Sequence, residues 1–373
     1  MTSLARGTPP FRADHVGSLL RPRAVAEARQ AWKRGALSAE ALRAVEDAAI
    51  REVVALQESV GLRSITDGEF RRDFWHLDFM WGFEGVRPSE EEFVIPFSGG
   101  QDFVAPAATV AGTVRYPAGG IMREHFKFLK ATTTRTAKFT MPAPTMFRHR
   151  LNPAAMTGTV YPDAAAFWAD IGAAYNAALK DLGSLGCSYV QMDDVNSCVL
   201  CDQAMRARIT EQGDDPDRVL DRYIGALNAA TAGRPAGMTV TTHMCRGNFR
   251  SEHVGRGGYE AIADKLLSQV DVDGFFMEYD DERSGDFRPL RFLPKGKFAV
   301  LGIVTSKTPT LESKDWLRRR IDEAAKHAPL EQLCLSPQCG FSSTHHGNNL
   351  TVDEQKRKLA LIVEVADAVW GSA

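Results

Sequence analysis

Short runs of apolar and β-branched residues alternate along the chain with longer amphipathic stretches, and this alternation limits the fold to a few α/β architectures. The runs predict eight strands, at residues 15–18, 64–67, 137–141, 189–193, 238–243, 274–278, 298–304 and 332–335. The amphipathic stretches between most of them predict helices, at residues 23–33 with 39–60, 163–185, 215–230, 257–268, 314–327 and 352–370. Eight strands that alternate with helices favour a (β/α)₈ TIM barrel, whose active site lies at the carboxyl ends of its strands.

One stretch interrupts the alternation after the second predicted strand. Residues 83–117 contain several prolines, the adjacent Gly99 and Gly100, and a polar run at 89–92. This composition predicts an inserted hairpin or lid rather than a part of the barrel. Because the insertion follows a strand end, it would lie next to the barrel mouth and could cover a substrate. With the insertion included, we expect residues 1–373 to form one catalytic barrel domain.

The composition narrows the choice of partners. The chain has 373 residues, 44% of them hydrophobic, and a formal net charge of -2, so it can bury a large core and has no excess charge that would attract nucleic acid. No run approaches the roughly 18 apolar residues of a membrane span, and the amino terminus lacks an apolar signal core. We therefore expect a cytoplasmic protein that acts on small molecules. The six cysteines are unevenly spaced, which does not suggest a disulfide framework and leaves them available as ligands.

Side chains able to do chemistry follow most of the predicted strands, as the barrel hypothesis requires. They are Ser18 after the first strand, Glu69 after the second, Asp193 with Asp194 at the fourth, His243 and Cys245 at the fifth, Glu278 at the sixth, Thr305 to Lys307 after the seventh and Cys339 after the eighth. No comparable cluster precedes the strands. We expect these side chains to meet at one end of the barrel.

Four of these residues, His243, Cys245, Glu278 and Cys339, form a ligand set suited to zinc. Each alone has an ordinary explanation, because a free cysteine is usually a small buried hydrophobe and a glutamate can cap a helix. Their joint position at strand ends of one barrel favours a metal site.

Two other pairs of residues could also be functional, but the sequence gives them no clear role. Cys198 and Cys201 spell a Cys-x-x-Cys motif without a partner pair, which favours a packing role, and the pair His345 and His346 is either a proton relay or a solvated loop.

Six motifs, in the same order and over nearly the whole chain, resemble those of the cobalamin-independent methionine synthase family. They lie at residues 12–18, 66–70, 191–193, 242–245, 276–278 and 336–340. The resemblance is to the short, single-barrel form, since the full-length synthases carry an additional amino-terminal barrel. It implies that His243, Cys245, Glu278 and Cys339 bind zinc. It also implies that Ser18, Glu69 and Asp193 bind the backbone of homocysteine.

The implied reaction explains these residue types. A free thiol with a pKa near about 8.5 is mostly protonated at neutral pH, and coordination to zinc deprotonates it. Glu278 would be the exchangeable fourth ligand that leaves when the substrate sulfur arrives. Glu69 and Asp193 match an ammonium group, and Ser18 can donate to a carboxylate. The prediction is a zinc-dependent methyltransferase that makes methionine from homocysteine.

The sequence does not identify the methyl donor, because it departs from the family pattern at two positions. Thr305 replaces a histidine that follows the seventh strand in the full-length enzymes, and residues 142–148 lack their pterin-stacking tryptophan. The donor is therefore a methyltetrahydrofolate or a smaller methyl compound, with a methyl-delivering partner protein as a further possibility. Trp75 and Trp81 are either an aromatic wall for the donor or core residues.

Two alternatives to this function also remain. The first is a zinc-dependent thiol alkyltransferase of the epoxyalkane:coenzyme M type, against which the ammonium-binding carboxylates argue. The second is a non-catalytic, zinc-stabilised barrel, against which the long separation of Cys245 and Cys339 along the chain argues. The sequence does not predict the oligomeric state.

Overall fold

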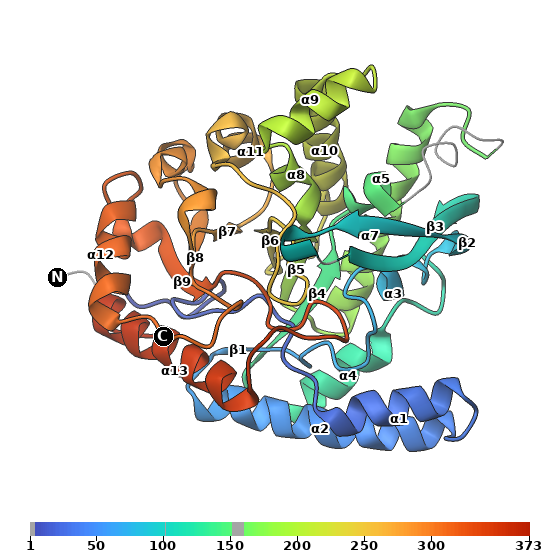
Figure 1. The fold of residues 1–373 in the computed structure, drawn as a ribbon, viewed down its shortest axis with the longest axis horizontal. Helices are drawn as coiled ribbons and strands as arrows, with labels where there is room; N and C mark the ends of the chain where they lie inside the picture. The colour runs from blue at the N-terminus through green and yellow to red at the C-terminus, as the bar shows by residue number, and fades with distance from the viewer. Residues whose placement is uncertain (1–3, 101, 151–159) are drawn as a thin grey trace.

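A curled parallel sheet surrounded by helices forms the centre of the computed structural model, which describes residues 4–100, 102–150 and 160–373 (Figure 1). The sheet has seven strands in the order β1-β4-β5-β6-β7-β8-β9. Their bounds are Ser64–Ile65 (β1), Thr136–Pro142 (β4), Tyr189–Asp194 (β5), Thr239–Met244 (β6), Gly274–Glu278 (β7), Phe298–Val304 (β8) and Leu333–Pro337 (β9). Strands β5 and β7 are buried along their whole length, as expected for parallel strands covered on both faces. The predicted α/β barrel fold is confirmed.

The first predicted strand, at residues 15–18, is wrong in position. Only Ala13 forms a parallel bridge, with Leu335 of β9, and the backbone nitrogen of Asp14 donates to the Leu335 oxygen over 3.0 Å. The chain then bends at Gly17, whose φ of 134° disfavours any other residue. Beyond it, the Thr66 hydroxyl donates to the Gly17 oxygen over 2.7 Å, and the Leu19 nitrogen donates to the Gly68 oxygen over 3.1 Å, just after β1. One bridge and a few separate hydrogen bonds thus take the place of an eighth strand.

The long helices lie outside the sheet and bury one face against it (Figure 1). In α7, Ala164–Ser184, the buried Ile171, Tyr175, Ala178 and Leu182 recur every three or four residues, and Asp163 caps the first turn by accepting from the Ala166 nitrogen. The other long helices are α1 (Arg23–Lys33), α2 (Ala39–Ser59), α4 (Arg123–Thr132), α10 (Pro216–Thr231), α12 (Lys314–Ala324) and α13 (Val352–Trp370). Shorter ones are α3 (Leu77–Met80), α5 (Met146–Arg150), α8 (Val195–Val199), α9 (Gln203–Glu211) and α11 (Ala263–Gln269). Among the described residues, no helix has both the length and the apolar character needed to cross a membrane.

The predicted insertion contains an antiparallel hairpin of β2, Glu84–Pro96, and β3, Asp102–Arg115. Its tip is fixed to the loop that follows β6, because the Ser98 nitrogen donates to the His253 oxygen over 2.8 Å. The ring of Phe103 packs on that of Phe249 from the same loop, with centroids 5.3 Å apart. The hairpin is therefore held next to the carboxyl ends of the sheet strands.

Candidate metal centre

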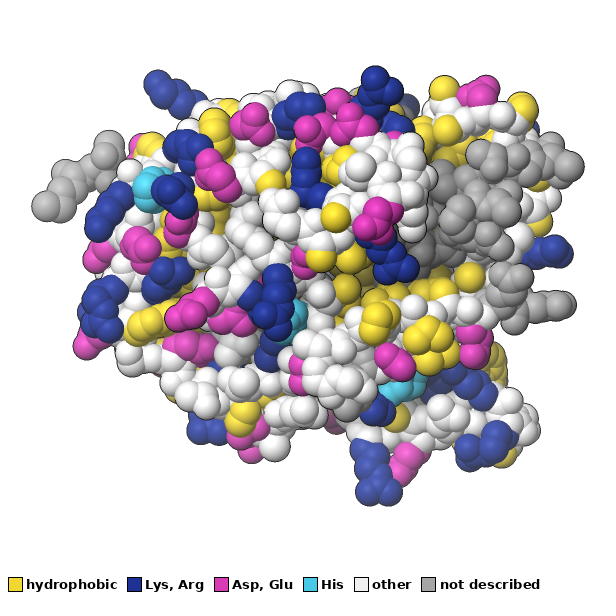
Figure 2. All heavy atoms as spheres, turned by 45° about the horizontal axis from the view of Figure 1, so that its top comes forward, with side chains coloured by type: hydrophobic (Ala, Val, Ile, Leu, Met, Phe, Trp, Pro, Cys, Tyr) yellow, Lys and Arg dark blue, Asp and Glu magenta, His cyan; other side chains and the backbone are white. Residues whose placement is uncertain are grey.

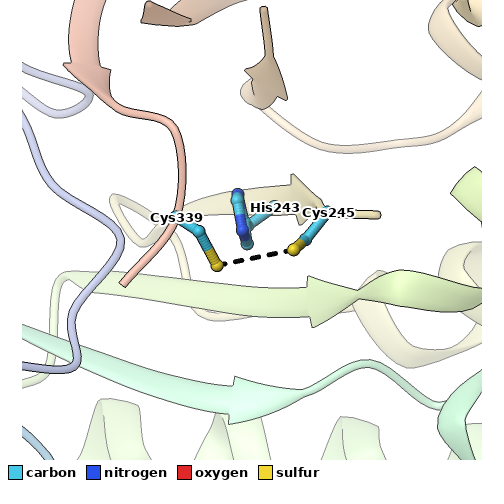
Figure 3. A group of neighbouring side chains, drawn as sticks. All are labelled: His243, Cys245 and Cys339. Atoms are coloured by element: carbon cyan, nitrogen blue, oxygen red, sulfur yellow. Dashed lines mark hydrogen bonds between the residues drawn. The ribbon is translucent and has the colours of Figure 1, made fainter. Parts of the chain in front are cut away.

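Three predicted ligands meet at the carboxyl ends of β6 and β9. His243 is the penultimate residue of β6, Cys245 follows β6 directly, and Cys339 lies two residues after β9. All three are buried, and one ligand atom from each lies within 4.8 Å of the others. The two sulfurs are 3.4 Å apart and share a hydrogen bond, and the three side chains point toward one another (Figure 3). The parallel sheet thus brings together residues almost a hundred positions apart in the sequence.

The three side chains fit a zinc ion. Both ring nitrogens of His243 are buried, and neither has a hydrogen-bond partner in the described part of the chain. A buried polar group without a partner lowers the stability of the fold, and a bound ligand would remove that cost. An imidazole nitrogen beside two sulfurs is a donor set that zinc prefers. The donor chemistry and the unsatisfied imidazole therefore agree with the predicted metal.

The two thiols differ in how easily they ionise. The hydrogen bond from Cys245 holds the pKa of the Cys339 thiol well below its ordinary value, and the neighbouring imidazole of His243 and ammonium of Lys307 act in the same direction. The same hydrogen bond, together with burial, raises the pKa of the Cys245 thiol well above its ordinary value. The pair therefore tends to keep one proton and one negative charge, and a thiolate is the form that binds a metal.

Glu278, the predicted fourth ligand, lies outside the three-donor group. It ends β7 and is fully buried. Its Oε1 is 2.7 Å from Nη2 of Arg283 and 3.5 Å from Nζ of Lys307, and its Oε2 accepts from the backbone nitrogen of Arg246 over 2.8 Å. Burial alone would raise the pKa of Glu278, but Lys307, Arg246 and Arg283 outweigh it and hold the pKa at about 2. The carboxylate is thus charged and bound by cations, and it contacts the backbone of Arg246, the residue that follows Cys245.

The residues predicted to bind an amino acid line the same cavity as the three donors. Ser18, Glu69 and Asp193 border this cavity, whose volume is about 990 Å³. Glu69 has a positive φ of 62°, which is rare for a residue other than glycine, and its Oε1 accepts from the Thr140 hydroxyl over 2.7 Å. Its Oε2 is buried without a hydrogen-bond partner in the described residues. One acceptor atom therefore remains free for a ligand.

The two carboxyl groups favour a bound cation. Burial raises the pKa of Glu69, and burial together with the nearby Glu69 raises the pKa of Asp193 to about 7. Although Nη1 of Arg72 lies 3.7 Å from Oε1 of Glu69, both shifts mean that the charged forms lack full compensation in this cavity. An ammonium group placed between these carboxylates would supply it. The site can therefore select a ligand with a positive charge at this end.

Ser18, which lines the cavity together with Glu69 and Asp193, also contacts the loop that contains Cys339. Its backbone oxygen accepts from the Phe341 nitrogen over 2.9 Å. Any side chain at Gly340 would collide with Ser18, because a Cβ there would lie 1.9 Å from the serine hydroxyl oxygen. Glycine at 340 thus allows the two loops to approach, which keeps Ser18 and Cys339 on one wall.

Aromatic side chains that the sequence analysis did not single out form another wall of the cavity. Phe93, Phe97 and Phe103 of the hairpin segment and Phe249 after β6 line it. Trp75 lines it as well, whereas Trp81 packs edge-on against Phe74, with centroids 6.4 Å apart. On the face drawn in Figure 2, hydrophobic side chains gather around a hollow. The apolar run at 93–97 was the available signal in the sequence, but it did not indicate which of its side chains would meet the barrel.

The remaining candidates lie apart from the three donors. Cys198 and Cys201 are buried in the main hydrophobic core, in agreement with a packing role. His345 and His346 are exposed, with ring centroids 3.9 Å apart. The backbone nitrogen of Thr305 donates to Glu312 over 2.8 Å, and Thr305 is not among the described residues that line the cavity.

Known proteins match nearly the whole length of the chain. The family model for the catalytic domain of cobalamin-independent synthases matches residues 11–368. An uncharacterized protein of Bacillus subtilis, YxjH, is 40% identical over 364 residues, which are 97% of this chain and 95% of the relative. The 5-methyltetrahydropteroyltriglutamate–homocysteine methyltransferase of Trichodesmium erythraeum is 23% identical over 337 residues, which are 90% of this chain but 41% of that longer protein. A B12-independent methionine synthase from a Shewanella species, solved in complex with selenomethionine, has the same fold, with a TM-score of 0.74, 21% identity and coverage of 96% of this chain and 97% of that one.

Proposed function

The chain belongs to the family of cobalamin-independent synthase catalytic domains, and we propose on that basis that it is a zinc-dependent S-methyltransferase that converts homocysteine to methionine. The observation that carries the proposal is the group of His243, Cys245 and Cys339 in one cavity with the carboxylates of Glu69 and Asp193. The first set is suited to activating a thiol, and the second to binding an ammonium group. Homocysteine carries both groups.

The metal half of the site consists of His243, Cys245 and Cys339, with Glu278 as the exchangeable fourth ligand. When bound, zinc lowers the pKa of a coordinated thiol so that it is a thiolate at neutral pH. The imidazole of His243 supplies its neutral nitrogen, and the two cysteines supply thiolates. Because the two cysteines would donate electrons as thiolates, a substrate sulfur held beside them would keep enough charge to attack a methyl carbon.

The amino-acid half of the site orients the substrate. Glu69 and Asp193 accept hydrogen bonds from the ammonium group, and Ser18 donates to the carboxylate. These contacts fix one end of homocysteine, so that its thiol faces the cysteine end of the same cavity. Holding both reactants in the right geometry accounts for a large part of the rate enhancement at such a site.

The remaining volume of the cavity is the place for the methyl donor. A cavity of about 990 Å³ exceeds what homocysteine alone would fill, and the aromatic wall of Phe93, Phe97, Phe103 and Phe249 would exclude water from the transfer. In the transfer, the methyl carbon gains a bond to sulfur and loses its bond to the donor, whose leaving atom keeps the electron pair. The donor is a methyltetrahydrofolate or a smaller methyl compound. The comparisons give no support to a methyl-delivering partner protein.

The names of two relatives support the substrate. The Trichodesmium enzyme is named for methyl transfer to homocysteine, and the Shewanella synthase is bound to selenomethionine, an analogue of the product. A thiol alkyltransferase for coenzyme M is disfavoured, because Glu69 and Asp193 would repel a sulfonate. A cytoplasmic location remains a prediction.

Methionine formation tests the proposal. We expect zinc-loaded protein, mixed with homocysteine and methyltetrahydrofolate, to give methionine detectable by mass spectrometry. Cys339→Ser should give none, whereas Cys187→Ala, which alters a buried cysteine just before β5, at the opposite end of the strands from the site, should behave as wild type. Folded, zinc-loaded protein that neither binds nor methylates homocysteine, with any donor tried, would contradict the proposal.

A further inference from the structure

Glu278 occupies a position in which every carboxylate oxygen has a partner other than a metal. Oε1 lies between the guanidinium of Arg283 and the ammonium of Lys307, at 2.7 Å and 3.5 Å, and Oε2 accepts from the Arg246 backbone nitrogen at 2.8 Å. Asp280 contacts the same two cations, at 3.3 Å from Arg283 and 3.7 Å from Lys307, and so helps to hold them in place. The two cations and the backbone N–H thus form a binding site for a carboxylate, and the Glu278 side chain occupies it.

The backbone of Glu278 is fixed independently of its side chain. Its nitrogen donates to the Tyr259 hydroxyl over 2.8 Å, and its oxygen accepts from Nη1 of Arg246 over 3.3 Å. The hydroxyl of Tyr259 donates in turn to the Met244 oxygen over 3.0 Å, next to Cys245. Because the backbone is held, any movement of the Glu278 carboxylate toward the cysteine side has to come from its side-chain torsions.

A carboxylate that leaves a metal inside a protein needs another positive charge. An uncompensated buried charge is strongly destabilising, whereas a buried charge that is paired and hydrogen-bonded is tolerated. We propose that Arg283 and Lys307 form a counter-site that holds the Glu278 carboxylate away from the metal while the substrate thiol occupies the fourth ligand position. Arg283 and Lys307 are then positioning residues, which act on ligand exchange through Glu278. This inference rests on the proposed zinc centre and adds a second resting place for its exchangeable ligand.

Zinc affinity measures how the metal and the counter-site compete for the Glu278 carboxylate. Lys307→Met removes one cation and leaves a side chain of similar length, so Glu278 should spend more time on the metal. Groups next to metal ligands typically change metal affinity by about 10- to 100-fold, and we expect Lys307→Met to bind zinc about tenfold more tightly in competition with a chromophoric chelator. Homocysteine should bind the zinc-loaded variant about tenfold more weakly in calorimetry, because Glu278 is harder to displace. Lys307→Arg keeps the charge and should resemble wild type.

Lys307 also repels a zinc ion directly, and a double-mutant cycle separates that effect. In a Glu278→Gln background, the direct repulsion persists but the competition for Glu278 is gone. We therefore expect Lys307→Met to tighten zinc binding by less than about threefold in that background, since the coupling between two residues is lost when one is removed. Arg288→Met, which removes an exposed arginine paired with Asp286 on the segment after β7, is the control and should leave both affinities unchanged.

Each outcome decides one point. A tightening that disappears with Glu278→Gln supports the counter-site. An equal tightening in both backgrounds would overturn it, because Lys307 would then act on the metal only through its own charge. Unchanged zinc and homocysteine affinities in folded Lys307→Met would overturn it as well, because the ion pairs would then only stabilise the loops. Wild-type protein that binds no zinc is a different failure, which removes the proposed function itself. Arg283→Met provides an independent second variant if Lys307→Met does not fold.

Discussion

Glu69 holds an uncommon backbone conformation at the point where the chain enters the cavity. Its φ is 62°, that of the preceding Gly68 is 64°, and its nitrogen is held by the Asp67 carboxylate over 2.9 Å. A left-handed conformation at a residue other than glycine costs of order 1 kcal/mol and often marks a functional position. The turn brings Oε1 to the Thr140 hydroxyl, and Oε2 has no hydrogen-bond partner among the described residues. This position agrees with the role proposed for Glu69, which is to bind the ammonium group of the substrate.

Replacing this carboxylate by an amide should weaken substrate binding without removing the metal. Glu69→Gln keeps the shape and the Thr140 hydrogen bond but removes the charge. We expect homocysteine to bind about 10- to 100-fold more weakly, since a hydrogen bond to a charged group contributes about 1.5–3 kcal/mol. Calorimetry and a zinc assay on the same samples would measure both properties. Glu58→Gln is a matched control, because Glu58 also accepts from a threonine hydroxyl, that of Thr133, but lies on helix α2 outside the cavity lining. Equal affinity in wild type and Glu69→Gln would exclude Glu69 from the amino-acid site.

The same variant should change how stability depends on pH. Burial raises the pKa of Glu69 in the folded protein above its unfolded value, so the folded state binds this proton more tightly than the unfolded state does. Stability therefore falls as pH rises through the unfolded pKa of about 4.3 toward the folded pKa. Without ligand, Glu69→Gln should unfold in more urea than wild type at pH 8, and the difference should shrink toward pH 4. A difference that grows toward acid would show the opposite shift.

The hairpin of β2 and β3 has one face on the barrel and one face in solvent, and the two faces should respond differently to mutation. Phe103 is 3% exposed and packs on Phe249, whereas its neighbour Val104 is 46% exposed. Phe103→Ala should lower the free energy of unfolding by about 3 kcal/mol, as truncation of a buried phenylalanine does. Val104→Ala should change it by no more than about 0.5 kcal/mol. Urea denaturation of the two variants compares them, and similar losses would mean that the hairpin does not dock as described.

Elements with strong periodicity could be predicted closely, and elements defined by distant contacts could not. The predicted helix at 23–33 has the bounds of α1, and the predicted strands at 274–278 and 298–304 have those of β7 and β8. The strand at 15–18 failed because its pairing depends on Leu335, more than three hundred residues away, and on the bend at Gly17. The helix predicted at 257–268 begins only at Ala263, because residues Tyr259–Ala261 form a separate 3₁₀ turn before it.

At the scale of the whole molecule, the predicted strand ends indicated where most of the candidate site lies. The sequence placed His243, Cys245 and Cys339 together because parallel strands of a barrel open toward one end. It could not place the Glu278 carboxylate, whose position depends on Arg283 and Lys307 from the loops after β7 and β8. Nor could it predict the aromatic wall, since the orientation of the hairpin depends on contacts with the distant loop after β6, such as the packing of Phe103 on Phe249. Ion pairs and docking between segments carry no local periodicity.

Zinc should stabilise the molecule without being needed to fold it. The large core is independent of the three donors, so protein treated with a chelator should remain folded. A ligand at about a thousand times its Kd adds about 4 kcal/mol, and each kcal/mol shifts the Tm of a domain of this size by about 2 °C, which gives a rise of about 8 °C. Thermal unfolding with and without zinc measures the shift. Cys339→Ser should show little of it, and a full shift in that variant would place the zinc elsewhere.

The central claim is that the thiol of homocysteine becomes a ligand of the metal held by His243, Cys245 and Cys339. X-ray absorption at the zinc edge, before and after addition of homocysteine, tests it most directly because it counts sulfur ligands. We predict that the zinc-loaded protein gains one sulfur ligand and loses one oxygen ligand when homocysteine binds. An unchanged number of sulfur ligands at saturating homocysteine would contradict the account, because the substrate would then bind without being activated by the metal.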